Sequence, residues 1–185
     1  AFPSLRRMQA EVLDFASSWL GADGNSAGYF TSGGTESILM ALKAARDQFA
    51  QDRGVSKPNV VLPSSAHAAF AKAGAYFGIE LRRTAVKSDW RADVEAMRMA
   101  IDENTIMVAC SAPQYPQGVI DDVPAVAALA LEMGINCHVD ACMGGVSLAY
   151  LERLGRNIPS WNFRVPGVTS MSVDLHKFGY TSKGS

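Results

Sequence analysis

The segment VDLHKFGYTSKGS, residues 173–185, places a lysine where it can act as a nucleophile. Lys177 directly follows an apolar run and lies between His176 and Phe178, so we expect it to be partly buried. Burial lowers the pKa of an amine, and a neutral amine can attack an aldehyde to form an imine. The alternative is a lysine that extends from a strand end into solvent.

A second segment, TSGGTES at residues 31–37, has the composition of a phosphate site. Its two glycines, of which Gly34 is the second, let the backbone approach a ligand closely, and Thr35 stands where a helix is predicted to begin. The free N–H groups and the positive end of a helix dipole attract anions. The same letters also fit a glycine turn followed by a threonine N-cap.

Two further segments supply a carboxylate and a histidine. Asp140, in HVDACMGG, ends an apolar strand, where a carboxylate is costly unless it meets a cation such as a protonated pyridine nitrogen. His67, in SAHAAF, opens a predicted helix among small residues that leave room for a flat ring to stack. A capping aspartate and a structural histidine are the alternatives. His138, on the same strand face as Asp140, is either a structural hydrogen-bonding residue or part of the site.

Together these segments offer a phosphate cradle, a ring-stacking histidine, a carboxylate for a pyridine nitrogen and an imine-forming lysine. These are the groups that pyridoxal 5'-phosphate requires. Each signal is modest alone, and their combination is far more specific. The sequence therefore predicts a pyridoxal-phosphate site.

The elements that position these residues are short apolar strands alternating with helices. This alternation predicts an α/β fold with three layers, in which a mostly parallel sheet has helices on both faces. In such sheets ligands bind at the carboxyl ends of the strands, where the candidate residues fall. Strands are expected at 59–63, 79–86, 105–112, 136–141 and 167–174, and helices at 5–19, from 34 onward, at 65–78, 94–102 and 123–134; the stretch after 141 is expected to be irregular up to the last strand.

Composition limits the remaining possibilities. The chain has 185 residues, 48% hydrophobic and 19% charged, which fits one well-packed domain, and its net charge of −1 gives no footprint for nucleic acid. No apolar run approaches the roughly 20 residues of a membrane span. The three cysteines lack metal-ligand spacing; we expect reduced thiols, a cytoplasmic setting and no metal site. The start without an initiator methionine suggests a piece of a longer protein.

The chain resembles the sphingosine-1-phosphate lyase family in TSGGTESILMALKAARD, SAHAAFAKAGAYFGIEL, CSAPQYPQGVIDDV, HVDACMGG and GVTSMSVDLHKFGYTSKGS. That family belongs to the fold-type-I pyridoxal-phosphate enzymes, beside the group II decarboxylases. Archaeal-type tyrosine and aspartate decarboxylases share the GGTE, HVDA and HK pieces but usually lack the lysine found here at position 183. The chain departs from the family pattern at Gln117-Gly118, where PHG is expected, and at Asp122, which replaces a usual proline.

The resemblance implies a role for each matched residue. Lys177 would form the imine with the cofactor, Asp140 would pair with the pyridine nitrogen, and His67 would stack on the ring. Lys183 would serve activity by handling the substrate. The remaining implied residues are Gly34, Thr35 and His176 as ligands of the cofactor phosphate, with Asp174 as a further cofactor candidate and Tyr180 as a further catalytic one.

The resemblance also implies an activity and an organisation. The expected reaction cleaves the C2–C3 bond of a phosphorylated long-chain base into a fatty aldehyde and phosphoethanolamine. Residues 1–185 would be the pyridoxal-phosphate-binding large domain, with an N-terminal segment and a C-terminal small domain outside it, in a homodimer. Segments outside this chain would account for any membrane association. The alternatives are an amino-acid decarboxylase acting on tyrosine, glutamate or aspartate, and a catalytically silent fragment.

Overall fold

A computed structural model describes residues 2–184 and contains a five-stranded sheet in which all neighbouring strands are parallel. The spatial order is β2-β1-β3-β4-β5. The chain therefore leaves β1 toward one edge of the sheet and returns to build β3, β4 and β5 toward the other. The strands are β1 (Asn59–Pro63), β2 (Glu80–Thr84), β3 (Thr105–Ser111), β4 (Asn136–Asp140) and β5 (Ser170–Ser172).

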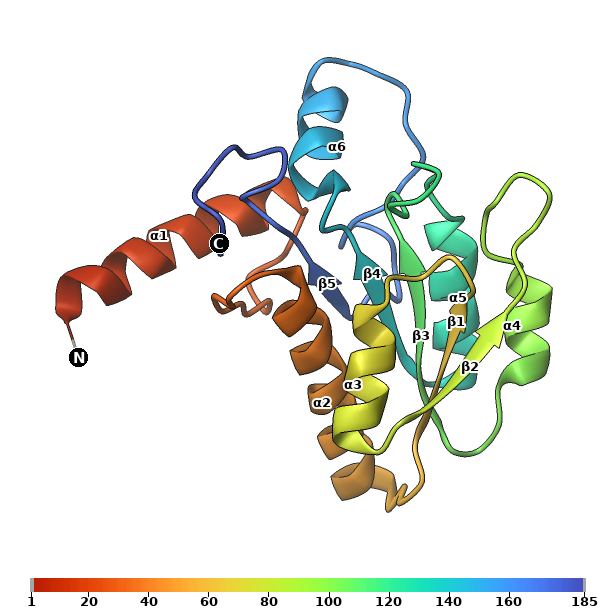
Figure 1. Cartoon of the computed structure of the whole chain (residues 1–185). Coiled ribbons are helices and arrows are strands. Elements are labelled where there is room, and N and C mark those ends of the chain that lie inside the picture. Colours follow the sequence, from red (N-terminus) through yellow and green to blue (C-terminus); the bar gives the residue numbers. More distant parts are fainter. Residues whose placement is uncertain (1, 185) are drawn as a thin grey trace.

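Helices cover both faces of this sheet, which confirms the predicted three-layer α/β fold. Figure 1 shows α2 and α3 along one face, α4 and α5 along the other, and α6 at one end beside α1. None of the helices within residues 2–184 combines the length and hydrophobicity needed to cross a bilayer. The helices are α1 (Pro3–Trp19), α2 (Gly34–Arg53), α3 (Ala69–Phe77), α4 (Val94–Ala100), α5 (Val123–Met133) and α6 (Gly144–Arg153).

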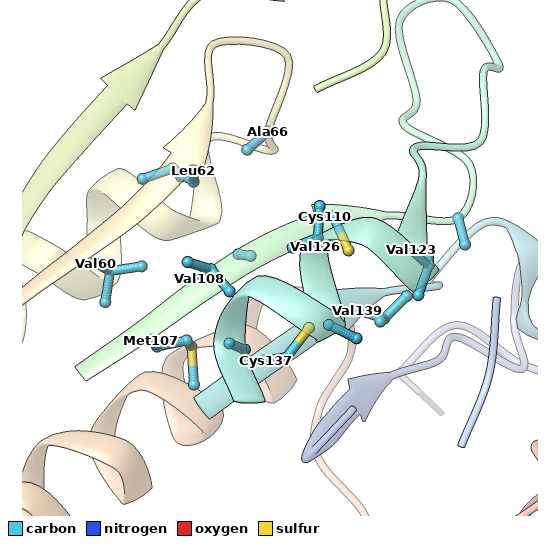
Figure 2. Packing of buried hydrophobic residues seen from close by; sticks show 14 of the residues in the cluster. Val60, Leu62, Ala66, Met107, Val108, Cys110, Val123, Val126, Cys137 and Val139 are labelled. Atoms are coloured by element: carbon cyan, nitrogen blue, oxygen red, sulfur yellow. The ribbon is translucent and has the colours of Figure 1, made fainter. Parts of the chain in front are cut away.

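The central strands are apolar because both of their faces are covered. Every residue of β1 and β3 is buried, as is nearly all of β4. Figure 2 shows Val60, Val108 and Val139 on these three strands, together with Val126 of α5, in one buried cluster. Full burial of one such side chain stabilises the fold by about 1.5–3 kcal/mol. The core thus fixes the strand ends from which the candidate site residues project.

Helix α6 lies in the stretch expected to be irregular, so that prediction is wrong. Its first two residues are glycines, which are poor helix formers. Close contacts with neighbouring segments explain why both positions are glycine. A Cβ on Gly144 would come within 2.0 Å of the Ala112 carbonyl oxygen, and one on Gly145 within 2.5 Å of the Val173 side chain. Tertiary packing here outweighs helix propensity.

Helix α3 begins at Ala69, four residues later than expected. The backbone N–H of Ser64 donates to Thr84 O (2.8 Å) and that of Ala66 donates to Pro63 O (3.0 Å), which forms a turn at the end of β1. His67 follows this turn, and its Nδ1 accepts a hydrogen bond from the Ala69 N–H at 3.0 Å. His67 therefore precedes the helix, and its side chain accepts the N–H of the first helical residue.

Helix α1 has the predicted amphipathic pattern, but most of its apolar stripe is not covered within the chain. Leu5, Met8 and Phe15 are exposed, and Trp19 is the member of the stripe that is buried. Figure 1 shows α1 extending away from the sheet. We call these three exposed side chains the α1 stripe.

Packing of α3 on the sheet makes a quantitative stability prediction. Phe70 is 0% exposed and Tyr76, on the same helix, is 65% exposed. Phe70→Ala removes a fully buried ring and leaves a cavity, so we expect it to lower the free energy of unfolding by about 3–5 kcal/mol. Tyr76→Ala serves as the matched control and should change it by less than about 1 kcal/mol. Urea unfolding measures both, and equal losses would contradict this packing.

Candidate active site

A cavity of about 370 Å³ lies at the carboxyl ends of the strands. The start of α2 and the segments that follow β1, β3, β4 and β5 form its walls. This is the place where ligands bind in open parallel sheets. Of the predicted site residues, those that line the cavity are Gly34, Thr35, His67, Asp140, Asp174, His176, Lys177 and Lys183.

The start of α2 forms the predicted anion site. Gly33, at the N-cap, has φ +135°, a conformation that essentially only glycine adopts, and it has no side chain to cap the first N–H groups of the helix. His176 lies over this glycine, since a Cβ on Gly33 would come 3.5 Å from the His176 Cε1 atom. Thr35 lines the same cavity one residue into the helix. A helix start, an imidazole and a hydroxyl thus surround one place suited to a phosphate.

Gly34 is held against two residues from the other side of the cavity. A Cβ at this position would lie 2.5 Å from Cys142 Sγ and 2.7 Å from Asp174 Oδ2. An alanine would therefore displace either the helix start or the carboxylate. Only a residue without a Cβ can bring its backbone this close to Cys142 and Asp174.

Asp140 is buried at the end of β4, where its carboxylate is hydrogen-bonded on one oxygen. Asp140 Oδ1 accepts from the backbone N–H of Cys142 at 3.1 Å and from the Ser172 hydroxyl at 3.3 Å. The carboxylate lines the cavity. It is therefore held in place from the sheet side and faces the ligand space, as its predicted role requires.

Lys177 and Asp174 form an ion pair within the cavity. Lys177 Nζ lies 2.9 Å from Asp174 Oδ2, and the Asp174 carboxylate is almost fully buried. Burial lowers the pKa of Lys177, but the hydrogen bond and charge of Asp174 outweigh it, so the pKa is raised above its ordinary value. The expectation of a lowered pKa is wrong, because contact between the amine and a carboxylate three residues earlier cannot be read from the spacing of the two residues.

His67 projects into the cavity beside Tyr115. Their ring centroids are 5.1 Å apart and the ring planes meet at 66°. The hydrogen bond from Ala69 fixes the orientation of the imidazole, and both rings line the cavity. A flat ligand ring would therefore meet an aromatic wall here, and stacking by His67 stays a prediction.

Tyr115 and Cys142 are cavity residues that the sequence did not point out as site residues. Tyr115 follows β3 in the Pro-Gln-aromatic-Pro turn, and an aromatic residue after a buried strand was the available signal. Cys142 follows β4, and its place two residues after Asp140 in HVDAC was the available signal. Burial and the charges of Asp140 and Asp174 raise the pKa of the Cys142 thiol, so it stays protonated.

Tyr180 is not brought to the cavity. Its side chain is 88% exposed and its backbone has φ +56°, uncommon for a non-glycine residue. The predicted catalytic role of Tyr180 therefore has no support in this arrangement. Gln117, one of the departures from the family pattern, is exposed outside the cavity lining, while Asp122 caps α5 by accepting a hydrogen bond from the Ala125 N–H at 3.1 Å.

One observation independent of the motifs is compatible with a bound pyridoxal phosphate. Within residues 2–184, the buried Asp174 Oδ1 atom has no hydrogen-bond partner. This atom lies close to Gly34, since a Cβ on that glycine would come within 2.9 Å of it. Asp174 lines the cavity, so this oxygen can accept a hydrogen bond from a group bound there. In the same part of the chain, no group of three or more His, Cys, Asp or Glu side chains is arranged to hold a metal ion.

A family model described as the pyridoxal-dependent decarboxylase conserved domain matches residues 2–184. The chain belongs to this family. The pyridoxal-dependent decarboxylase domain thus spans the whole described chain, and the cofactor expected from the sequence, pyridoxal phosphate, is confirmed at the level of the family.

Individual relatives confirm the resemblance to sphingosine-1-phosphate lyases. Sphingosine-1-phosphate lyase 1 of Rattus norvegicus is 50% identical over 185 residues, which are 100% of this chain and 32% of that protein. The structure of Burkholderia pseudomallei sphingosine-1-phosphate lyase matches with a TM-score of 0.94 at 41% identity, over 98% of this chain and 44% of that one. A probable L-tyrosine/L-aspartate decarboxylase of Methanothermobacter thermautotrophicus is 36% identical over 96% of this chain and 48% of its own length.

The ion pair in the cavity gives a prediction about Lys177 in the cofactor-free protein. Asp174→Asn removes the carboxylate while burial remains, so we expect the pKa of Lys177 to fall. Competitive acetylation with mass spectrometry, over a pH series, should show Lys177 becoming reactive at lower pH in this variant. Asp89→Asn, which removes a carboxylate paired with Arg91, is the control. An unchanged Lys177 profile would contradict the ion pair.

Proposed function

We propose that the protein to which this chain belongs is a pyridoxal-phosphate-dependent lyase that cleaves the C2–C3 bond of a phosphorylated sphingoid base. The products are a fatty aldehyde and phosphoethanolamine. The observation that carries this proposal is that Lys183 lines the same cavity as Lys177, within a chain 50% identical to a sphingosine-1-phosphate lyase.

Lys183 matters because this reaction brings a second phosphate to the site. The start of α2 and His176 suit the phosphate of the cofactor, and Lys177 is paired with Asp174. Lys183 is a further cation on the cavity wall, and an ammonium group is a strong ligand for a phosphate oxygen. An amino-acid substrate carries no phosphate and would not need it.

The other residues of the cavity have separate tasks. Pyridoxal phosphate, when bound, supplies an electron sink for the bond being broken. Asp140 would hold the ring-nitrogen proton by its negative charge, and the aromatic wall of His67 and Tyr115 would limit the ring's freedom. Asp174 Oδ2 lies where it can take the proton that Lys177 must lose to react as a neutral amine.

The proposed function predicts a defined pattern of products and variants in the full-length protein. It should release a fatty aldehyde from a phosphorylated sphingoid base. Lys177→Ala should abolish the visible absorption band of the cofactor imine, because the amine is gone. Lys183→Ala should keep the band and lose turnover, because only substrate handling is removed. Gas chromatography of the aldehyde and absorption spectroscopy measure these outcomes.

Lys72→Ala is the matched control, since Lys72 lies on α3 and does not line the cavity. It should keep both the band and the activity. Loss of the band in Lys183→Ala would show that Lys183 has been given the wrong role. Carbon dioxide released from tyrosine, glutamate or aspartate, with no aldehyde from the phosphorylated base, would refute the lyase.

Decarboxylation of an amino acid is the second candidate, favoured by the 36% identity to the probable tyrosine/aspartate decarboxylase. It would use the same cofactor residues and break the bond to a carboxylate instead of the C2–C3 bond. The product assay separates the two reactions directly. Lys183 is the residue whose presence favours the lyase.

We also propose that the full-length protein is a homodimer. The exposed α1 stripe supports this, because an apolar stripe of this kind is commonly covered by another surface. Analytical ultracentrifugation should therefore show two copies. Replacing the stripe residue Leu5 by a charged side chain, Leu5→Glu, should weaken the association, whereas Arg7→Glu on the same helix should change it less. A monomeric full-length protein would contradict this proposal.

A further inference from the structure

His138 is buried behind the candidate active site and does not line it. It lies on β4, two residues before Asp140, and is fully buried. Its Nδ1 is 2.9 Å from Ser170 Oγ and its Nε2 is 3.3 Å from Ser172 Oγ. Ser172 Oγ in turn lies 3.3 Å from Asp140 Oδ1. Three hydrogen bonds thus connect the core of the sheet to the carboxylate at the cavity.

The register of the sheet creates this connection. β4 and β5 pair in parallel, with His138 opposite Ser170 and Asp140 opposite Ser172. Side chains two residues apart on a strand point to the same face. The His-x-Asp of β4 therefore lies beside the Ser-x-Ser of β5 on one face, and each member contacts the next.

The chemistry of these groups fixes the direction of every bond. An ionised Asp140 can only accept, so the Ser172 hydroxyl donates to it. The Ser172 hydroxyl has only one hydrogen, which it donates to Asp140. It must therefore accept a hydrogen bond from His138, so Nε2 of His138 must carry a proton. In a neutral imidazole Nδ1 is then an acceptor and receives the hydroxyl of Ser170. All three donors consequently point toward the carboxylate.

We propose that His138 is a positioning residue which, through Ser172, holds Asp140 ionised and aimed at the pyridine nitrogen of the cofactor. The proposal rests on the pyridoxal-phosphate part of the proposed function and not on which bond is cleaved. A chain of hydrogen bonds with one direction strengthens each member and stabilises negative charge at its end. The carboxylate can then keep a ring nitrogen protonated.

The surroundings of His138 keep it neutral. Burial against the β-sheet core, with the Phe70 ring 6.0 Å from the imidazole, lowers the pKa of His138 to about 4, and the charge of Asp140 opposes this only in part. A cationic imidazole would have protons on both nitrogens, and the bond from Ser170 would reverse. The Nε2–H tautomer is therefore the form in which the directed chain is complete.

The first test reads the tautomer in the full-length, cofactor-free protein. Nitrogen-15 and carbon-13 NMR of histidine distinguish Nε2–H from Nδ1–H, and His138→Gln identifies the signal. We expect the Nε2–H form at neutral pH. In Ser172→Ala the Nε2 proton loses its acceptor, so the Nδ1–H form should appear. An Nδ1–H tautomer in the unmutated protein would overturn the proposal, whatever reaction the enzyme catalyses.

The second test uses the cofactor as the reporter. With nitrogen-15-labelled pyridoxal phosphate, the ring nitrogen should be protonated in the unmutated protein and less so in Ser172→Ala and His138→Leu. Cofactor binding should weaken by about ten- to a hundredfold in Ser172→Ala, which loses a hydrogen bond to a charged group, and by about two- to tenfold in His138→Leu, which loses one between neutral groups. His138→Gln should keep ring protonation, because its amide can donate to Ser172 in place of the imidazole.

Ser147→Ala is the control, since the Ser147 hydroxyl donates to the backbone carbonyls of Met143 and Gly144 at the start of α6. It should change neither cofactor affinity nor ring protonation. If His138→Leu lowers stability but leaves the ring nitrogen fully protonated, His138 is a core residue only and the proposal is wrong. Failure of lyase activity alone would bear on the proposed function and leave these readouts intact.

Discussion

The parallel pairing of β4 with β5 is the constraint on which the candidate site depends. It places Asp140 beside Ser172 and delivers Asp174 and Lys177 from the segment that follows β5. A register shift of one residue would turn the serines of β5 to the opposite face of the sheet. The carboxylate would then lose its hydroxyl donor, and the imidazole behind it would lose both partners.

This pairing is held by residues that take no part in chemistry. The Thr169 hydroxyl accepts a hydrogen bond from the Cys137 N–H and donates one to the Cys137 carbonyl, each at 3.0 Å. These bonds hold the start of β5 against β4. Gly145 allows the start of α6 to pack against Val173, directly before Asp174. The short edge strand β5 is thus fixed from both ends, although it contains only three residues. Its position, more than its length, determines the geometry of the cavity.

Much of the fold could be predicted because the buried strands β1 and β3 are largely apolar runs and β4 carries buried Cys137 and Val139. Such runs in a chain that alternates with helices admit few arrangements. The place of the cavity followed from the same pattern, since Asp140 ends a strand and His67 and Lys177 come after strands. The motifs thus indicated residues that line one cavity in the structure.

What could not be predicted depended on contacts between distant segments. Helix α6 begins with two glycines, so its propensity was misleading until their close neighbours were seen. The pKa of Lys177 is set by a carboxylate whose direction the sequence does not specify. The exposed position of Tyr180 likewise depends on how the last segment turns after Lys177.

The buried thiol of Cys142 makes the cavity chemically selective. The cavity lining includes this thiol and the amine of Lys177, both of which are potential nucleophiles. Ionising the thiol would create an anion beside two carboxylates, whereas deprotonating the ammonium leaves an uncharged amine and hands its proton to a neighbour already in contact. An electrophile that enters this space therefore reacts more readily with an amine than with the thiol, because burial and the nearby carboxylates oppose formation of a thiolate.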